Sequence, residues 1–450
     1  MNENAVSVFD SQLYSSVFSN ADMKAIWNDQ AVVQSWLDFE VALAKVQSEV
    51  GIIPAEALAS IKQICHLDII DWEELNQQTA FNGMAIKPVI DQLTHAGDEY
   101  VKSYLHWGGT TQDVLDTGQA IRLKSTLDLV LSQLEQLIEV LAKMADEHRH
   151  TVMVARTNSQ DALPTTWGLQ VSSYLSELIR HRQRVTELYP RACTGMFGGA
   201  IGNLSSLGDD VDGLMIRDRL LAALGLTVPN GAWNGSQDSI VEVVQVFALI
   251  HGSLVRMAND VELQGRSAIG ELVEGAKGGA SSTMPHKSNP RLANMIQSLS
   301  RLGWMYASGA PSLMDQQDIR AASMRVVSWS VVPEASVAVS TSLAKATEMM
   351  STLGVNSVRM EKNFEHSRYM MMSESVMMAL ARKIGRGQSY QLVKQAIAEH
   401  SCQAKLLPAM MLECQEIRFH LSESEITQAC YPSNYLGSND QLIDEVLRSV

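Results

Sequence analysis

The feature that most constrains this chain is a run of apolar residues spaced alternately four and three positions apart. The run lies in the middle of the sequence, at Leu123, Leu127, Val130, Leu134, Leu137, Leu141 and Met144. This spacing places all of them on one face of a long α-helix, the seam by which helices pack in bundles. Few stretches alternate in the manner of a β-strand. The core is therefore expected to consist of long, packed helices.

Four further long helices are predicted in the same region. They run from Trp167 to Leu188 with a stop at Pro190, from Ile240 to about Leu263, onward from Pro290, and from Val331 to Met350. The helix beginning at Ile240 is apolar on nearly every side, which is typical of a helix deep in a bundle or at a subunit interface. The predicted fold class is all-α, an elongated central bundle of long helices with smaller helical N- and C-terminal domains. We expect the three domains to cover 1–113, 114–352 and 353–450.

Charge and cysteine content exclude several classes of function. The net charge of −15 disfavours partners such as nucleic acid or an anionic membrane. The five cysteines are scattered and never form a C-x-x-C pair, which argues against a disulfide framework or a zinc site. The first five residues do not resemble a signal peptide, and charges interrupt every long apolar run. We expect a cytoplasmic protein without a membrane span, whose site must supply its own positive charge if the substrate is an anion.

Three segments carry residue types suited to chemistry. The first, Gly278 to Pro290, combines two glycines, a cluster of hydroxyl groups and Lys287 before a helix start, an arrangement that can stabilise an anion. The alternative is a solvated flexible loop. The second, His106 to Thr117, gathers a histidine, two threonines and an amide, but Thr111 or Asp113 could simply cap the following helix. The third, Arg156 to Gly168, could equally be a loop before a helix, with Pro164 near the first turn.

The ordered string Ser281-Ser282-x-Met284-Pro285-x-Lys287-x-Asn289-Pro290 resembles the signature of the fumarase/aspartase superfamily. The segments at His106–Thr117 and Arg156–Thr166 are similar to its first and second conserved regions, and the resemblance covers nearly the whole chain. It implies a homotetramer whose active sites are shared between subunits. It also implies a small carboxylate substrate and no metal or organic cofactor.

The resemblance assigns a role to each matching residue. Ser281, in a mobile loop, would be the base that abstracts the proton, with Lys287 and His106 as the other catalytic residues. Asn158 stands where adenylosuccinate lyase has a histidine that acts as general acid, and asparagine donates no proton at neutral pH. The expected substrate-binding residues are Thr110, Thr111, Gln112, Asn158, Gln160, Ser282, Met284, Asn289 and Arg320.

Within the superfamily, the chain is most similar to the branch of bacterial 3-carboxy-cis,cis-muconate cycloisomerase and adenylosuccinate lyase. Adenylosuccinate is disfavoured because Asn20-Ala21 stands where those lyases carry an arginine for the phosphate. The cycloisomerases have H-K-R-N-P, R-D-R and Q-E-H-E-R motifs where this chain has Ser288, Gln237-Asp238-Ser239 and Gln316 to Arg320. Cations of that pattern are missing, and Arg320 remains.

The predicted function is therefore a lyase that performs β-elimination, or the reverse addition, next to a carboxylate through an aci-carboxylate intermediate. The scaffold resembles the cycloisomerase and its substrate pocket is modified. One alternative is a C–N lyase that releases fumarate from an N-substituted aspartate or a nitrosuccinate-like compound. The second alternative is a non-catalytic structural homologue.

Overall fold

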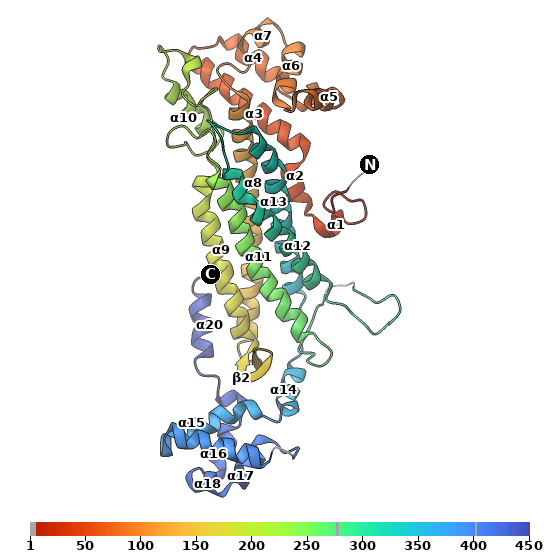
Figure 1. Cartoon of the computed structure of the whole chain (residues 1–450), viewed down its shortest axis with the longest axis vertical. Coiled ribbons are helices and arrows are strands. Elements are labelled where there is room, and N and C mark those ends of the chain that lie inside the picture. Colours follow the sequence, from red (N-terminus) through yellow and green to blue (C-terminus); the bar gives the residue numbers. More distant parts are fainter. Residues whose placement is uncertain (1–5, 276–278, 401–402) are drawn as a thin grey trace. The chain divides into compact units, whose positions relative to one another are not determined.

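A computed structural model describes residues 6–275, 279–400 and 403–450 of the 450-residue chain (Figure 1). Gly278, Cys402 and the first five residues, on which part of the sequence interpretation rests, lie outside the described residues.

Helices dominate the described residues and confirm the predicted all-α class (Figure 1). The α-helices are α1 (Ser15–Phe18), α2 (Ala21–Trp27), α3 (Asp29–Glu49), α4 (Ala55–Ile64), α5 (Trp72–Asn82), α6 (Ile86–Ala96), α7 (Glu99–Tyr104), α8 (Thr111–Glu147), α9 (Trp167–Ala192), α10 (Gly213–Ala223), α11 (Asp238–Gln264), α12 (Arg291–Gly309), α13 (Ala322–Ser351), α14 (Ser357–His366), α15 (Ser373–Ile384), α16 (Arg386–Glu399), α17 (Leu407–Glu413), α18 (Gln415–His420), α19 (Glu423–Ala429) and α20 (Asn439–Leu447). Two short antiparallel strand pairs interrupt them, β1 (Val152–Thr157) with β2 (Gln160–Thr166) and β3 (Leu272–Val273) with β4 (Gly354–Val355).

The five predicted long helices correspond to α8, α9, α11, α12 and α13. The apolar seam lies within α8, and its positions from Leu123 to Leu141 are buried. The predicted stop at Pro190 is wrong, because α9 continues to Ala192 with Pro190 inside its last turn. A proline so close to the end removes one backbone hydrogen bond, and the helix ends two residues later.

The chain divides into two compact units, each assembled from three segments. The first comprises Met1–Gln133, His181–Gly252 and Ser298–Ala344, and the second comprises Leu134–Arg180, Ser253–Gln297 and Lys345–Val450. Each of the five long helices contributes a segment to both units. The predicted boundaries at residues 113 and 352 stay a prediction.

The first unit is built around the N-terminal helices and the adjoining segments of the long helices. Its main apolar cluster joins α3, α4 and α6 with Val114 and Leu115 of α8 and with Ile216 and Leu220 of α10. The Trp304 indole Nε1 donates to the Ala248 carbonyl oxygen at 3.1 Å, which links α12 to α11.

The second unit contains both strand pairs and the C-terminal helices. Its apolar cluster is formed by α14 to α19 together with Val154 of β1. Gln170 of α9 donates to Asp260 of α11 at 3.2 Å, and Gln297 of α12 donates to Asn259 of α11 at 2.9 Å. Polar contacts therefore join three of the long helices within this unit.

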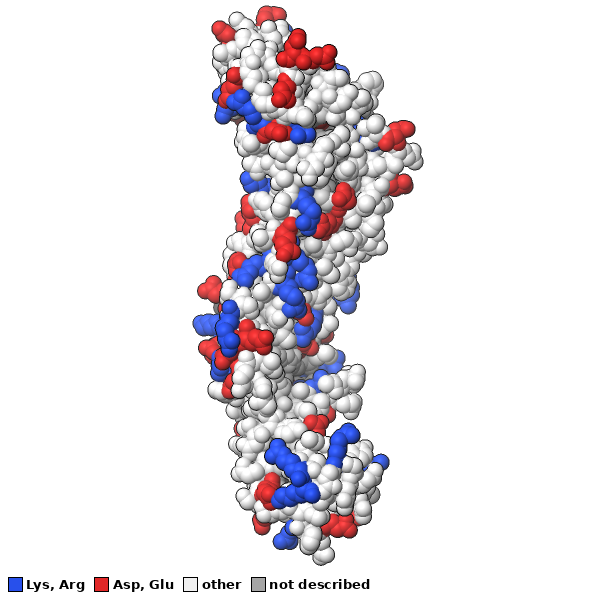
Figure 2. All heavy atoms as spheres, turned by 90° about the vertical axis from the view of Figure 1, so that its left-hand side faces the viewer, with Lys and Arg blue, Asp and Glu red and all other residues white. Residues whose placement is uncertain are grey.

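Charge and hydropathy bear on the expected partners. Figure 2 shows acidic and basic side chains intermingled on one face, so the acidic excess does not form a continuous patch there. By length and composition alone, α11 and α13 are apolar enough to cross a membrane, although Glu242 and Glu334 interrupt their apolar runs, as expected from the sequence. In the structure, 50% of the apolar window in α11 and 67% of that in α13 are buried, and the core helices of soluble proteins pass the same test.

Candidate active site

The signature segment forms a closed loop between α11 and α12. Asn289 donates to the Gly279 carbonyl oxygen from both its backbone N–H and its side-chain amide, at 3.0 and 2.9 Å. The Ser281 backbone N–H donates to the Lys287 carbonyl oxygen at 3.3 Å. Gly279 has a φ of 73°, and a Cβ at this residue would lie 2.4 Å from the Asn289 carbonyl oxygen, so only glycine fits. The signature asparagine therefore ties the two ends of the loop together.

Within this loop, two backbone N–H groups are directed at the Ser281 hydroxyl. Thr283 donates to Ser281 Oγ at 3.3 Å and Met284 donates at 3.0 Å. Hydrogen bonds accepted by an oxygen favour its negatively charged form. Ser281 and Asn289 are half-buried, whereas Ser282, Met284 and Lys287 are exposed. The loop thus holds the predicted base in an anion-stabilising turn and leaves the predicted lysine facing solvent.

The third segment is a β-hairpin rather than the helix-start loop considered as its alternative. β1 and β2 pair with Thr157 opposite Gln160, and the connecting residues Asn158 and Ser159 have φ values of 50° and 63°. Two consecutive left-handed residues form the tight turn that suits a two-residue hairpin, and asparagine tolerates this conformation well. Asn158 and Gln160 lie exposed at the tip of the hairpin.

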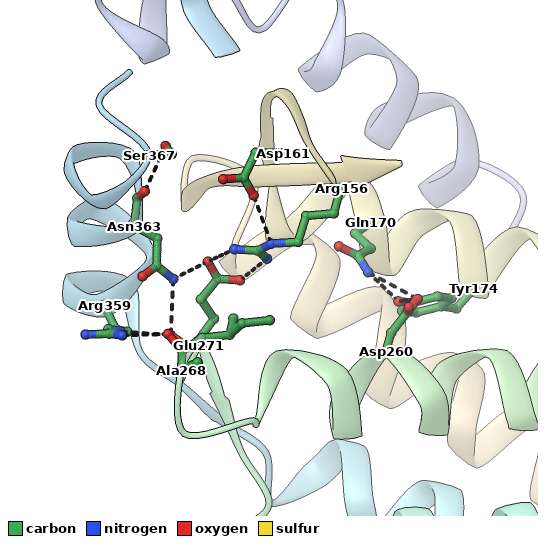
Figure 3. A network of polar contacts seen from close by, with 11 residues as sticks. Arg156, Asp161, Gln170, Tyr174, Asp260, Ala268, Glu271, Arg359, Asn363 and Ser367 are labelled. Atoms are coloured by element: carbon green, nitrogen blue, oxygen red, sulfur yellow. Dashed lines mark hydrogen bonds and ion pairs between the residues drawn. The ribbon is translucent and has the colours of Figure 1, made fainter. Parts of the chain in front are cut away.

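A buried acidic residue, Glu271, links this hairpin to the start of the signature loop (Figure 3). Its carboxylate accepts two hydrogen bonds from the Arg156 guanidinium, at 2.7 and 2.8 Å, and a third from the Asn363 amide at 2.6 Å. Asp161 lies 3.3 Å from the other side of the same guanidinium. Glu271 is fully buried and immediately precedes β3, so its side chain fixes the hairpin, the base of the loop and α14 together.

The second segment leads into α8, in the first unit, and holds His106 against Glu40 of α3. His106 Nδ1 donates to Glu40 Oε1 at 2.6 Å, and the Glu40 side chain is only 2% exposed. Burial by itself lowers the pKa of His106, but the charge and hydrogen bond of Glu40 outweigh it and raise the pKa above its usual value. The imidazole is therefore stabilised in its cationic form.

Asp113 organises the start of α8. Its carboxylate accepts the Thr110 backbone N–H at 3.1 Å, as in the reciprocal half of a capping box. It also accepts the backbone N–H groups of Gly198 at 2.9 Å and Gly199 at 3.0 Å. Burial raises the pKa of Asp113 to about 6, although the three N–H groups oppose this shift. The capping alternative is thus correct for Asp113, which in addition anchors the Gly198-Gly199 loop beside the threonines.

One turn further along α8, Asp116 lies among polar groups. Gln112 donates to it through its side-chain amide, and Arg325 and Arg320 act on it by charge. Burial raises the pKa of Asp116 to about 6 in spite of these partners. A small cavity of about 30 Å³ beside it is also lined by Ser236 and Gln237. Gln112 Oε1 and Arg320 Nη1 are buried without a hydrogen-bond partner in the described part of the chain, which is uncommon for buried polar atoms.

The predicted residues are therefore divided between the two units. His106, Thr110, Thr111, Gln112 and Arg320 belong to the first unit, and Asn158, Gln160, Ser281, Ser282, Met284, Lys287 and Asn289 belong to the second. Their roles in catalysis stay predictions. Sequence interpretation did not single out Glu40, Asp116, Glu271 or Arg325. A lone acidic residue in an amphipathic helix gives no local signal, although an acidic residue directly before an apolar strand, as at Glu271, is a weak one.

Comparisons with known proteins match most of the chain. The profile of the family described as Lyase matches residues 17–302, and that of the adenylosuccinate lyase C-terminus matches residues 370–446. The chain is 34% identical to 3-carboxy-cis,cis-muconate cycloisomerase of Pseudomonas aeruginosa, covering 97% of this chain and 96% of that one. It is 30% identical to N-acetyl-S-(2-succino)cysteine lyase of Dickeya dadantii, covering 99% and 98%.

Solved structures agree with these matches. The crystal structure of a fumarate lyase from Mesorhizobium superposes with a TM-score of 0.90 at 33% identity, covering 96% of this chain and 98% of that one. The helical bundle, the signature loop and the sequence matches thus lead to one conclusion: the chain belongs to the lyase family of the fumarase/aspartase superfamily.

Proposed function

We propose that this enzyme abstracts a proton from the carbon next to a substrate carboxylate, with Ser281 as the base. The observation that carries the proposal is the pair of hydrogen bonds that Ser281 Oγ accepts from the backbone N–H groups of Thr283 and Met284. A free serine is a poor base, and these donors stabilise the alkoxide that the reaction needs. Closure of the loop over the substrate would exclude water and strengthen the same interactions.

The elimination proceeds in two steps. The C–H bond next to the carboxylate breaks, the proton passes to Ser281 Oγ, and the electron pair moves into the carboxylate to give the aci-carboxylate. Lys287 and Asn289 stabilise the added charge, and the amide and hydroxyl groups of Gln112 and Thr111 hold the substrate. The electron pair then returns from the aci-carboxylate to form the C=C double bond, while the bond to the leaving group on the neighbouring carbon breaks and that group departs with the electrons of this bond. An oxyanion donor of this kind is typically worth ~10²–10³ in rate.

The charge of the pocket favours a dicarboxylate of the succinate class. In the described part of the first unit, Arg320 and Arg325 face Asp116, so two cations are partly offset by one carboxylate. Adding Lys287 from the signature loop leaves charge for about two substrate carboxylates. A 2-substituted succinate meets this requirement, and the product is fumarate. The similarity to N-acetyl-S-(2-succino)cysteine lyase supports this substrate class.

Lactonisation of 3-carboxy-cis,cis-muconate is the second candidate. The similarity to cycloisomerases over nearly the entire chain favours it. The reaction would be the addition of a carboxylate across a double bond, which is the reverse of the elimination described above. The tricarboxylate requires more positive partners, however, and Ser288 and Gln237 replace two cations found in that branch. We also propose that the enzyme is a cytoplasmic homotetramer.

An ultraviolet absorbance screen of the purified enzyme tests these alternatives. The panel holds N-substituted aspartates, S-(2-succino)cysteine derivatives, 3-carboxymuconate and adenylosuccinate. We expect formation of fumarate from a succinyl adduct and weak or no turnover of adenylosuccinate, because no arginine stands at Asn20-Ala21. Efficient turnover of adenylosuccinate, or of the muconate alone, would contradict the substrate class. Absence of turnover across the panel together with no binding of fumarate would favour a non-catalytic homologue.

A further inference from the structure

A second, larger cavity of about 270 Å³ lies in the first unit, among α2, α3, α8 and α13. It meets α8 at Leu115, Gln119 and Arg122. On a helix, these positions form a face adjacent to the one that carries Gln112 and Asp116. Apart from Gln119, the residues lining this cavity are not those lining the small cavity beside Asp116. The cavity therefore borders the candidate active site without containing any of its predicted residues.

Arg122 supplies a positive charge to this cavity. Its guanidinium lies 4.7 Å from the centroid of the Trp27 ring, and its Nε donates to the Gly118 carbonyl oxygen at 3.1 Å. None of the ion pairs in the described residues includes Arg122, although Asp29 also lines the cavity. Burial alone accounts for the shift that lowers the pKa of Arg122 to about 10. A half-buried cation with no carboxylate partner is costly and is satisfied by an anion.

Two further hydrogen-bond donors in the cavity lining lack a partner. Trp36 Nε1 and Thr79 Oγ1 are buried, and neither has a hydrogen bond within the described part of the chain. Buried polar atoms are rarely left unsatisfied, so these two point to a ligand that offers acceptor oxygens. The indoles of Trp27, Trp36 and Trp329 make up much of the apolar wall. Such a wall favours a flat, apolar ligand body.

We propose that this cavity is a second ligand site that binds a small aromatic carboxylate. The ligand carboxylate pairs with Arg122 and accepts hydrogen bonds from Trp36 and Thr79, while its ring packs against the tryptophans. Such a compound has no leaving group next to its carboxylate, so it is not a substrate for the elimination proposed above. The site is independent of that reaction.

Isothermal titration calorimetry tests the proposal, with benzoate titrated into the purified full-length protein. We expect saturable binding with a Kd on the order of 1 mM, a value reasonable for a ligand of this size. Benzamide, which has the same ring without the charge, should bind at least about tenfold more weakly, as expected for loss of a charge-assisted hydrogen bond.

Two variants locate the binding. Arg122→Gln should weaken benzoate binding at least about tenfold. Ala85→Leu, which adds volume at the cavity wall without removing a charge, should also abolish binding, and it decides the matter if Arg122→Gln does not fold. Arg320→Gln, in the candidate active site, should leave benzoate binding unchanged. The proposal is overturned if the wild type shows no saturation, or if binding survives Ala85→Leu and is lost in Arg320→Gln.

Discussion

At the scale of single residues, the structure distinguishes the two adjacent serines of the signature. Ser281 is half-buried and its hydroxyl oxygen accepts hydrogen bonds from two backbone N–H groups, whereas Ser282 is exposed in the same turn. Only the oxygen of Ser281 lies where negative charge is stabilised. This difference has a physical cause in the loop, beyond the resemblance that first assigned the base.

Replacing Ser281 with alanine should abolish turnover with little effect on folding. We expect kcat to fall at least ~10²-fold, the usual effect of losing a general base, with KM nearly unchanged. The free energy of unfolding should change by no more than about 0.5 kcal/mol, because the loop is largely solvent-exposed. Steady-state kinetics and thermal unfolding measure both. Ser282→Ala is the matched control and should lose much less activity. If Ser281→Ala keeps more than about a tenth of the rate, another residue, such as His106, is the base.

The pair of His106 and Glu40 should make stability depend on pH. The pKa of His106 is raised in the folded protein, so its contribution is complete below the pKa of the unfolded imidazole and is lost as pH rises through the folded value. Glu40→Gln removes the charge that raises this pKa. We expect it to lower the free energy of unfolding by about 1–2 kcal/mol at mildly acidic pH and by less at alkaline pH.

Urea denaturation at several pH values measures this difference. In a His106→Gln background, the effect of Glu40→Gln should no longer depend on pH, which isolates the pair from other titrating groups. An effect of Glu40→Gln that grows toward alkaline pH would contradict the assignment of a raised pKa to His106.

At the scale of elements, long helices were predictable and the hairpin was not. The apolar seam from Leu123 to Leu141 repeats over five turns, and a repeated pattern of this length specifies a helix whatever its surroundings. The hairpin of β1 and β2 is short, and Pro164 in β2 imitates the first turn of a helix. Arg156 of β1 pairs with Glu271, more than a hundred residues away in sequence, and no local pattern reveals that contact. The signature loop was recognisable because its residue order is itself specific.

The buried carboxylate of Glu271 should be essential for holding the hairpin. Glu271→Gln keeps the shape but removes the charge opposite Arg156, leaving a buried cation poorly paired. We expect a loss of ~3 kcal/mol in the free energy of unfolding and a lower kcat, because Asn158 and Gln160 lie at the hairpin tip. Denaturant titration and kinetics test this.

Asp161→Asn provides the control for this prediction, since Asp161 contacts the same guanidinium from an exposed position. Exposed ion pairs contribute little, so this variant should lose no more than about 1 kcal/mol. If Asp161→Asn destabilises the protein as much as Glu271→Gln does, burial of Glu271 is not what makes the network strong.

At the scale of the whole molecule, apolar side chains on the long helices indicate further subunits. In the first unit, Leu249 of α11 is 52% exposed and Met305 of α12 is 65% exposed, with Trp304 beside it at 41%. Large exposed apolar groups clustered on bundle helices are typical of surfaces that bind another protein chain. The same observation accounts for the predicted helix from Ile240, whose sequence is apolar on nearly every side. We therefore expect a homotetramer in analytical ultracentrifugation.

Sharing of active sites between subunits can be tested by mixing two inactive variants. His106 belongs to the first unit and Ser281 to the second, and we propose that one site combines these regions from different chains. His106→Ala and Ser281→Ala should each be inactive alone. When they are coexpressed and assemble at random, a site that takes the two regions from different subunits is free of both changes in about a quarter of cases. Activity should therefore return to roughly a quarter of the wild-type value.

Coexpression of Ser281→Ala with Lys287→Ala is the matched control and should restore no activity. Both changes affect the same loop, so every loop in the assembled tetramers carries one of them. If the His106 and Ser281 variants also fail to restore activity although hybrid tetramers form, each site is built from a single chain.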